Sequence, residues 1–250
     1  MLKSDLAAEL TEAKSHTLEQ DIDRCDVYVD KALSNKIGKP AGNYVTVESR
    51  IAAEGNAVRF RRLSKAIADV LRELAPGGKN VLTVGLGNKL LTADALGCLT
   101  IEKTVVYVTE KYAVRVFAPG VAGVTGIESY DVIKGLVEAV APDLVIAVDS
   151  LCASKVSRIA TSFQLSDAGI TPGSGVKNAR KPLSRDTLGV KVISIGVPMV
   201  VYASTILAEG GAGFIGGEDM VVTPKDVDIM VENCAEIIAG AINMFGKKHR

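Results

Sequence analysis

Continuous apolar runs alternate with segments of helical periodicity through the middle of the chain. The runs are rich in Val and Ile, lack polar/apolar alternation, and are bounded by Gly, Pro or charged residues, which is typical of strands covered on both faces. They lie at residues 80–84, 105–108, 143–148 and 191–195. Helical periodicity marks residues 56–74, 93–103 and 129–140. This alternation predicts an α/β fold of three layers, α/β/α, with a mostly parallel sheet.

The C-terminal segment carries the clearest helix start in the sequence. Thr223 is placed to cap a helix, Pro224 suits its first position, and the acidic Asp226 follows three residues after the cap. We therefore expect a helix from residue 224 to about residue 244.

The N-terminal part is less regular. Short strand-like runs at residues 26–29 and 44–47 flank a turn-rich piece at 36–42, which predicts an edge hairpin or a small added layer. No internal repeat, low-complexity tract or linker interrupts the sequence. We expect a single domain over residues 1–250, with an N-terminal segment and edge strands at 1–50 and an α/β core at 51–250.

Charge and hydropathy exclude two classes of partner. The 250 residues include 29 Lys plus Arg and 29 Asp plus Glu, so the chain lacks the basic footprint that direct nucleic-acid binding needs. The N-terminus has no apolar segment suited to a secretory signal, and the longest apolar stretch, at residues 190–207, is interrupted by Lys191 and Pro198. We expect a soluble, cytoplasmic protein with no membrane contact.

Few residues remain for the common catalytic sets. The four cysteines are far apart and form no CxxC pair, which indicates neither a zinc ribbon nor a disulfide framework. His16 lies in a polar N-terminal segment and His249 is the penultimate residue. A Ser-His-Asp triad, a Cys-His pair and a His-rich metal site are therefore not expected.

A glycine turn leaves the first apolar strand. Gly85, Gly87 and Asn88 lead through a short segment into the helix that follows. Such a turn could cradle a phosphate at a helix N-terminus, but a third glycine and an acidic residue after a second strand are missing, which disfavours a dinucleotide site. The alternative is that the glycines allow a tight turn and deliver Asp94 to the carboxyl edge of the sheet.

A second acidic residue, Asp149, directly follows the apolar run at 143–148. Because strands of one parallel sheet end at the same edge, Asp94 and Asp149 could converge there, where α/β sheets bind ligands. An ionised carboxylate can take a proton from water while a protonated partner polarises a carbonyl. The open alternative is that each only caps a helix, Asp149 the one starting near Ser150.

A long glycine-rich loop spans residues 164–176 and is followed by the basic residues Lys177, Arg180 and Lys181. The loop could bind an anion through its backbone amides, or it could be a plain surface loop with a solvated charge cluster. Ser174 is a weak candidate nucleophile because no histidine accompanies it.

These segments resemble the germination protease family, the spore endopeptidase of spore-forming Firmicutes. The resemblance rests on motifs that occur in order along nearly the whole chain. They are Ser-Asp-Leu-Ala at 4–7, Phe-Ala-Pro-Gly-Val at 117–121, Thr-Gly-Ile-Glu at 125–128, Asp-Val-Ile-Lys-Gly at 131–135, Asp-Ala-Gly-Ile-Thr-Pro-Gly-Ser-Gly-Val at 167–176, Thr-Leu-Gly-Val at 187–190, Ile-Gly-Val-Pro at 195–198 and Val-Thr-Pro-Lys at 222–225.

The resemblance implies an atypical aspartic endopeptidase that degrades small acid-soluble spore proteins in the cytoplasm of the germinating spore. Its two catalytic aspartates fall on Asp94 and Asp149. It also implies a homo-oligomer and a fold similar to the hydrogenase-maturation endopeptidases, which add a metal-binding histidine. No internal histidine is present here, which favours a metal-free pair with no cofactor. Residues expected to shape or support the substrate site are Asn88, Ser166, Asp167, Gly173, Ser174 and Gly175.

Two alternatives stay open: a metal-dependent maturation-type endopeptidase with Asp94 and Asp149 as oxygen ligands, and a non-catalytic sporulation protein of the same fold. The sequence also departs from the family in two places. Members usually carry a presequence, removed in a zymogen step, whereas only three residues precede Ser4 here. Many have a longer insert where residues 209–222 connect the last two helices, so specificity or assembly is expected to differ.

Overall fold

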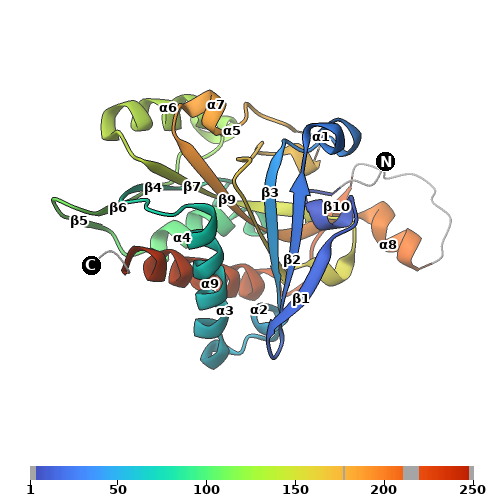
Figure 1. Cartoon of the computed structure of the whole chain (residues 1–250). Helices are drawn as coiled ribbons and strands as arrows, with labels where there is room; N and C mark the ends of the chain where they lie inside the picture. The colour runs from blue at the N-terminus through green and yellow to red at the C-terminus, as the bar shows by residue number, and fades with distance from the viewer. Residues whose placement is uncertain (1–3, 177, 211–219, 248–250) are drawn as a thin grey trace.

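The computed structural model describes residues 4–176, 178–210 and 220–247, in which ten strands form one sheet with helices on both faces (Figure 1). The strands are β1 Lys14–Glu19, β2 Ile22–Val29, β3 Gly42–Glu48, β4 Asn80–Gly85, β5 Tyr107–Val108, β6 Ala113–Phe117, β7 Leu144–Ala153, β8 Ser162–Ser166, β9 Lys191–Tyr202 and β10 Val221–Val222. The α-helices are α1 Lys31–Ile37, α2 Ile51–Glu54, α3 Ala57–Leu74, α4 Leu96–Lys103, α5 Ala122–Thr125, α6 Ser129–Val140, α7 Arg185–Leu188, α8 Ala203–Glu209 and α9 Val227–Lys247. Four 3₁₀ turns are η1 Ala7–Glu9, η2 Thr92–Asp94, η3 Val156–Arg158 and η4 Ser174–Val176.

The sheet has a parallel centre and antiparallel flanks. Its strand order is β1-β2-β3-β8-β9-β7-β4-β6-β5, and β10 pairs with β9. The four central strands, β6, β4, β7 and β9, are parallel, and the other pairings are antiparallel. The three-layer α/β/α class is confirmed, and the sheet as a whole is mixed because β8 and the N-terminal strands extend it on one side.

Both faces of the central strands are apolar, which explains their unbroken hydrophobic runs. Ile146 and Val148 of β7 pack into the core beneath α3 and α9, whereas Val145 and Ala147 pack on the opposite face with residues of α6. Successive side chains of a strand point to opposite faces, so a strand between two helical layers needs apolar residues at every position.

The expected helices occur, and the one at residues 129–140 is observed as α6. The strands predicted at 143–148 and 191–195 also occur, but β7 and β9 continue past these ends to Ala153 and Tyr202. The prediction at residues 105–108 is wrong in part. Only Tyr107–Val108 is a strand, and it pairs antiparallel at the edge. On the side of β4 away from β7, the parallel neighbour is β6, which the sequence pattern does not reveal because Arg115 interrupts its apolar run.

The last helix begins three residues later than predicted. Thr223 does not cap it, because its hydroxyl donates instead to the carbonyl of Met199 in β9 at 2.7 Å, and α9 begins at Val227. Among the described residues, the 227–246 stretch of α9 alone is long and apolar enough to cross a membrane. This helix packs against α3, α4 and β9, and 56% of the apolar stretch is buried, as in the core helix of a globular fold.

The N-terminal strands continue the main sheet and do not form a separate layer. β2 pairs antiparallel with β3, as expected for an edge hairpin, and β3 pairs antiparallel with β8. This extension brings the segment around Ser4 to the same side of the sheet as the ends of β7 and β8.

Candidate active site

A cavity of about 970 Å³ lies where β4 ends and β7 and β9 continue. β4 stops at Gly85, opposite Val148, so the next residue of β7, Asp149, has a strand partner only on the β9 side, where it faces Gly196. Unequal strand lengths thus open a crevice at the carboxyl edge of the parallel strands, the place where α/β sheets bind ligands.

The glycine turn after β4 places Asp94 at this crevice. Gly87 has φ of +98°, and a Cβ on it would lie 2.0 Å from the carbonyl oxygen of Asp94, so the turn closes directly on that residue. The backbone amide of Asn88 donates to Asp94 Oδ2 at 2.8 Å. The amide that could have held a phosphate therefore binds the aspartate, and Asn88 acts through its backbone.

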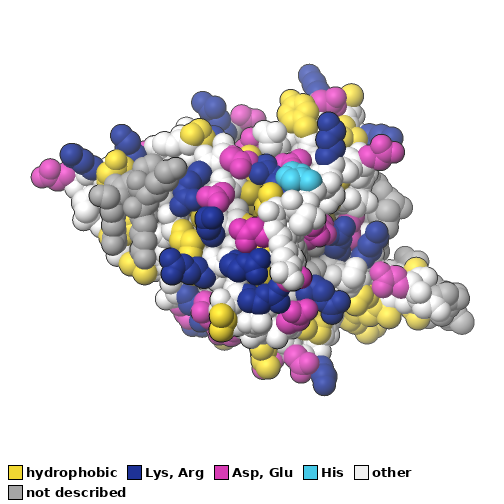
Figure 2. Space-filling model, turned by 60° about the horizontal axis from the view of Figure 1, so that its bottom comes forward, with side chains coloured by type: hydrophobic (Ala, Val, Ile, Leu, Met, Phe, Trp, Pro, Cys, Tyr) yellow, Lys and Arg dark blue, Asp and Glu magenta, His cyan; other side chains and the backbone are white. Residues whose placement is uncertain are grey.

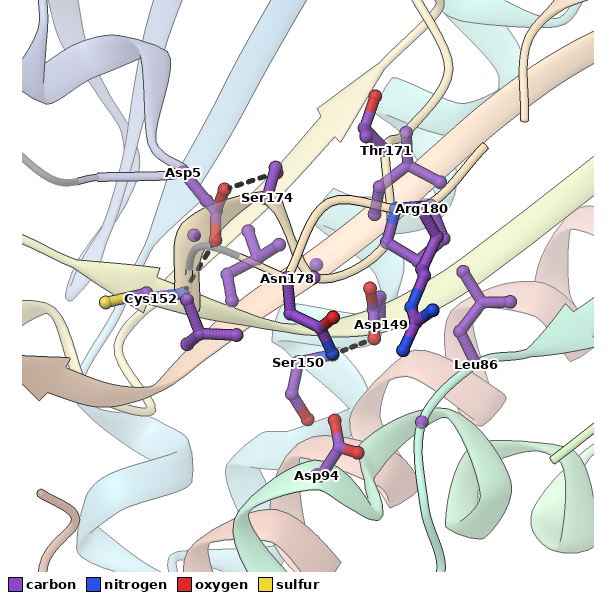
Figure 3. A pocket seen from close by; sticks show the side chains of 18 of the residues that line it. Asp5, Leu86, Asp94, Asp149, Ser150, Cys152, Thr171, Ser174, Asn178 and Arg180 are labelled. Atoms are coloured by element: carbon purple, nitrogen blue, oxygen red, sulfur yellow. Dashed lines mark hydrogen bonds between the residues drawn. The ribbon is translucent and has the colours of Figure 1, made fainter. Parts of the chain in front are cut away.

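Neither aspartate caps a helix, so that alternative is wrong. Residue Ala95 precedes α4, and no side chain accepts a hydrogen bond at this helix start. β7 runs on to Ala153, so no helix begins near Ser150. Instead, Asp94 and Asp149 both line the cavity, as the convergence of strand ends predicts. Figure 3 shows their carboxylates entering it from different elements, with Ser150 between them in this view.

The two carboxyl groups have unequal environments. Asp149 is only 6% exposed, and burial, followed by the negative charges of Asp94 and Asp5, raises its pKa well above the usual range, against the opposing hydrogen bond from the Ser150 amide. Asp94 is half-buried, and burial also raises its pKa, although the Asn88 amide opposes the shift. Burial thus favours the protonated form of Asp149 more strongly than that of Asp94.

The glycine-rich loop predicted at residues 164–176 begins later than expected, because residues 164–166 belong to β8. Its part at residues 169–176, together with residues 178–180, forms a wall of the cavity. Gly173, Ser174 and Gly175 line it, as do Asn178 and Arg180, whose side chains project into it on the side of Asp149 (Figure 3).

Basic residues at the end of this loop attach it to the start of α6. Arg180 forms an ion pair with Glu128 at 3.2 Å, and Lys181 stacks over the ring of Tyr130 at 3.7 Å. Lys177 lies outside the described residues. The loop is thus held over the site by contacts to a second element, unlike a plain surface loop.

Three predicted site residues, Asn88, Ser166 and Asp167, do not line the cavity, and Asn88 contacts the site only through its backbone amide. Ser166 is buried at the end of β8, where its hydroxyl accepts a hydrogen bond from the Ala168 amide. Asp167 accepts hydrogen bonds from the backbone and side-chain nitrogens of Asn43, both at 2.7 Å. Ser166 and Asp167 thus fix the junction between β3 and the loop, and they support the site only indirectly.

Asp5 and Lys39 also line the cavity, although the sequence pattern does not mark either of them as a site residue. Asp5 belongs to the Ser-Asp-Leu-Ala motif at residues 4–7, which is the one available signal. No strand pattern surrounds it, however, and nothing in the sequence shows that the N-terminal segment reaches the end of β7.

The donor groups do not form a zinc-type site. In the described part of the chain, no three His, Cys, Asp or Glu side chains are grouped to hold a metal ion. His16 lies on exposed β1, and His249 is outside the described residues. Catalytic zinc sites present three protein ligands, so the residues around Asp94 and Asp149 do not fit one.

Known proteins are similar in sequence to this chain over most of its length. A family model for the germination protease matches residues 5–215. The germination protease of Caldanaerobacter subterraneus subsp. tengcongensis is 34% identical, the match covering 86% of this chain and 82% of that protein. The germination protease of Bacillus subtilis is 39% identical, with 84% of this chain and 66% of that protein covered.

Among solved structures, the [NiFe] hydrogenase maturation protease HycI from Thermococcus kodakarensis is similar, with a TM-score of 0.47 and 22% identity over 71% of this chain and 99% of that one. The family model and the two germination proteases decide the relationship, since they extend over most of this sequence. The chain belongs to the germination protease family and is a peptidase.

Proposed function

We propose that the protein is an aspartic endopeptidase in which Asp94 and Asp149 activate a water molecule against a peptide carbonyl. One observation carries the proposal: Asp149 of β7 and Asp94 of the turn after β4 line one cavity, and their surroundings differ in burial. Pairs of carboxyl groups whose environments separate their pKa values commonly divide into an acid and a base.

The geometry suggests a role for each residue. Between the two pKa values of the pair, one proton is shared, and burial favours its residence on Asp149. Ionised Asp94 then takes a proton from water, the water oxygen bonds to the carbonyl carbon, and Asp149 gives its proton to the carbonyl oxygen. In the second step Asp94 returns its proton to the amide nitrogen as the C–N bond breaks, and Asp149 recovers a proton from the hydroxyl left on carbon.

The substrate proposed is a small acid-soluble spore protein, cleaved in the spore cytoplasm during germination by a homo-oligomer without a cofactor. The family name supports a role in germination. The net charge of zero supports a protease that acts on DNA-binding proteins without itself binding DNA. On the face shown in Figure 2, Lys and Arg side chains lie among Asp and Glu, in accord with ion pairs such as Arg24–Glu73 and Arg62–Glu19.

Cleavage of a purified small acid-soluble spore protein by Asp94→Asn and Asp149→Asn tests the mechanism. Each variant keeps the side-chain shape and removes the titrating group, so we expect kcat to fall by about 10²–10⁴-fold. Asp131→Asn is the matched control, because Asp131 is exposed on α6 and does not line the cavity. It should keep wild-type activity.

Full activity of either cavity variant would refute the carboxylate pair. An inactive wild-type protein that binds the same substrate would instead support the non-catalytic alternative. Circular dichroism of all three variants shows whether any loss of activity comes from a loss of folding.

A further inference from the structure

The N-terminal segment is tied to the end of β7 by reciprocal hydrogen bonds. The amide of Asp5 donates to the carbonyl of Cys152 at 2.8 Å, and the amide of Cys152 donates to Asp5 Oδ2 at 3.0 Å. Gln164 of β8 clamps the same segment, since its Nε2 donates to the carbonyl of Asp5 and its Oε1 accepts from the amide of Ala7. Asp5 therefore sits beside the strand that carries Asp149.

The second carboxylate oxygen of Asp5 holds two further parts of the chain. Asp5 Oδ1 accepts a hydrogen bond from Ser174 Oγ at 3.0 Å and pairs with Lys39 Nζ at 3.4 Å. The dashed lines in Figure 3 show the contacts to Ser174 and Cys152. The carboxylate of Asp5, a residue that is 8% exposed, thus joins the N-terminal segment, β7, the glycine-rich loop and the segment after α1.

Gly175 lies directly against the carboxylate of Asp5. A Cβ there would lie 1.8 Å from Asp5 Oδ2 and 2.9 Å from the Cβ of Cys152, so no side chain fits. Tyr202 also holds the loop, because its hydroxyl donates to the carbonyl of Gly175 at 2.9 Å. The Gly-Ser-Gly run therefore closes on Asp5 as well as facing the cavity.

We propose that Asp5 is a positioning residue of the peptidase, whose carboxylate fixes the glycine-rich loop against β7 beside Asp149 and supplies a negative charge to that end of the cavity. This inference rests on the proposed role of Asp149. The loop contributes a wall of the cavity, so releasing it would disturb the binding of the substrate. The charge acts on Asp149, because a nearby negative group favours its protonated form.

Three variants separate the two roles, with kcat and KM measured across pH on the purified spore protein. The charged groups that line the cavity are Asp5, Lys39, Asp94, Glu128, Asp149 and Arg180, and all except Asp5 and Lys39 stay unchanged in these three variants. Asp5→Asn removes the charge, so Asp149 should lose its proton more easily and the basic limb of the kcat/KM profile should move to lower pH. We also expect kcat/KM to fall about tenfold or more, since the loop loses its charged anchor.

Lys39→Gln removes the positive charge that pairs with Asp5. The negative charge of Asp5 should then favour the protonated form of Asp149 more strongly and move the basic limb to higher pH. Ser174→Ala keeps both charges and removes only the hydrogen bond to the loop, so KM should rise about tenfold while the basic limb stays in place. A merely structural role for Asp5 would not produce shifts of opposite sign.

Asp5→Asn with a wild-type kcat, KM and basic limb, alongside inactive Asp94→Asn and Asp149→Asn, would overturn this inference and leave the carboxylate pair standing. Activity in those two variants would instead refute the pair. If Asp5→Asn fails to fold by circular dichroism, Lys39→Gln and Ser174→Ala decide, and an unmoved basic limb in the first together with an unchanged KM in the second overturns the inference.

Discussion

Gly97 is a position where a single added methyl group should disturb the candidate site. It is the second residue of α4, and a Cβ there would lie 2.4 Å from both the nitrogen and the oxygen of Leu86 and 2.5 Å from the carbonyl oxygen of Val148. All three are backbone atoms. The Leu86 amide donates to the Val148 carbonyl at 2.8 Å, so the methyl group would strike both partners of this hydrogen bond. The bond joins the glycine turn to β7 directly before Asp149.

The size of the effect follows from one stabilising and two destabilising contributions. Replacing glycine by alanine in a helix stabilises it by at most about 1 kcal/mol. Forcing a methylene into a packed interior costs about 1–3 kcal/mol, and a buried amide that loses its acceptor costs about 1–3 kcal/mol more. We expect Gly97→Ala to lower the free energy of unfolding by about 3 kcal/mol, and Tm by about 6–12 °C for a chain of this size. A displacement of about 1 Å between the segments carrying Asp94 and Asp149 should reduce kcat about 100-fold.

Chemical denaturation, thermal unfolding and peptide cleavage at a temperature where the variant is folded would measure these effects. Gly135→Ala is the matched control, because Gly135 is an exposed residue of α6 and a Cβ added to it would meet nothing within 4 Å beyond the adjacent residues and backbone of its own helix. The control should be about 1 kcal/mol more stable than wild type and fully active. Equal stability and activity of the two alanine variants would refute the close-packing argument.

Two further results are expected. Because the pKa of Asp149 is raised in the folded protein, the stability that its protonated form contributes is present below the pKa of the unfolded state and is lost as pH rises through the pKa of the folded state. Asp149→Asn should therefore have a higher Tm than wild type at neutral and alkaline pH, and the difference in Tm should shrink in acid. A difference in Tm that does not depend on pH would contradict this. Removal of divalent metal with a chelator should leave wild-type cleavage unchanged, and a loss of activity restored by added metal would support the metal-dependent alternative.

The parallel centre of the sheet can be predicted because its strands obey a local rule. β4, β7 and the start of β9 lie between two helical layers, and their unbroken apolar runs show it. β6 cannot be predicted in this way, because Arg115 interrupts its apolar run. β9 extends beyond its predicted end because Pro198 does not stop it. Proline is tolerated there because the pairing of β7 with β9 shifts register beside it, between Leu151 and Cys152.

Contacts between distant segments account for the other differences. Thr223 has the right neighbours for a helix cap, yet its hydroxyl bonds to the carbonyl of Met199 beside that register shift, and a tertiary contact replaces the local one. The convergence of Asp94 and Asp149 can be inferred from strand ends. The approach of Asp5 cannot, because it depends on how β3 and β8 carry the N-terminal part around to β7.

The different burial of Asp94 and Asp149 follows from the unequal lengths of β4 and β7. If β7 ended level with β4, Asp149 would lie at a solvated strand end, where a carboxyl group ionises easily. Because β7 continues beside β9 and the N-terminal segment closes over its end through Asp5, Asp149 is buried while Asp94, on the turn after β4, stays half-exposed. Burial raises the cost of charging one carboxyl more than the other, which is the asymmetry an acid and base pair requires. Removing the N-terminal segment that closes over the end of β7 should therefore abolish the proposed division into an acid and a base, as replacing either aspartate should.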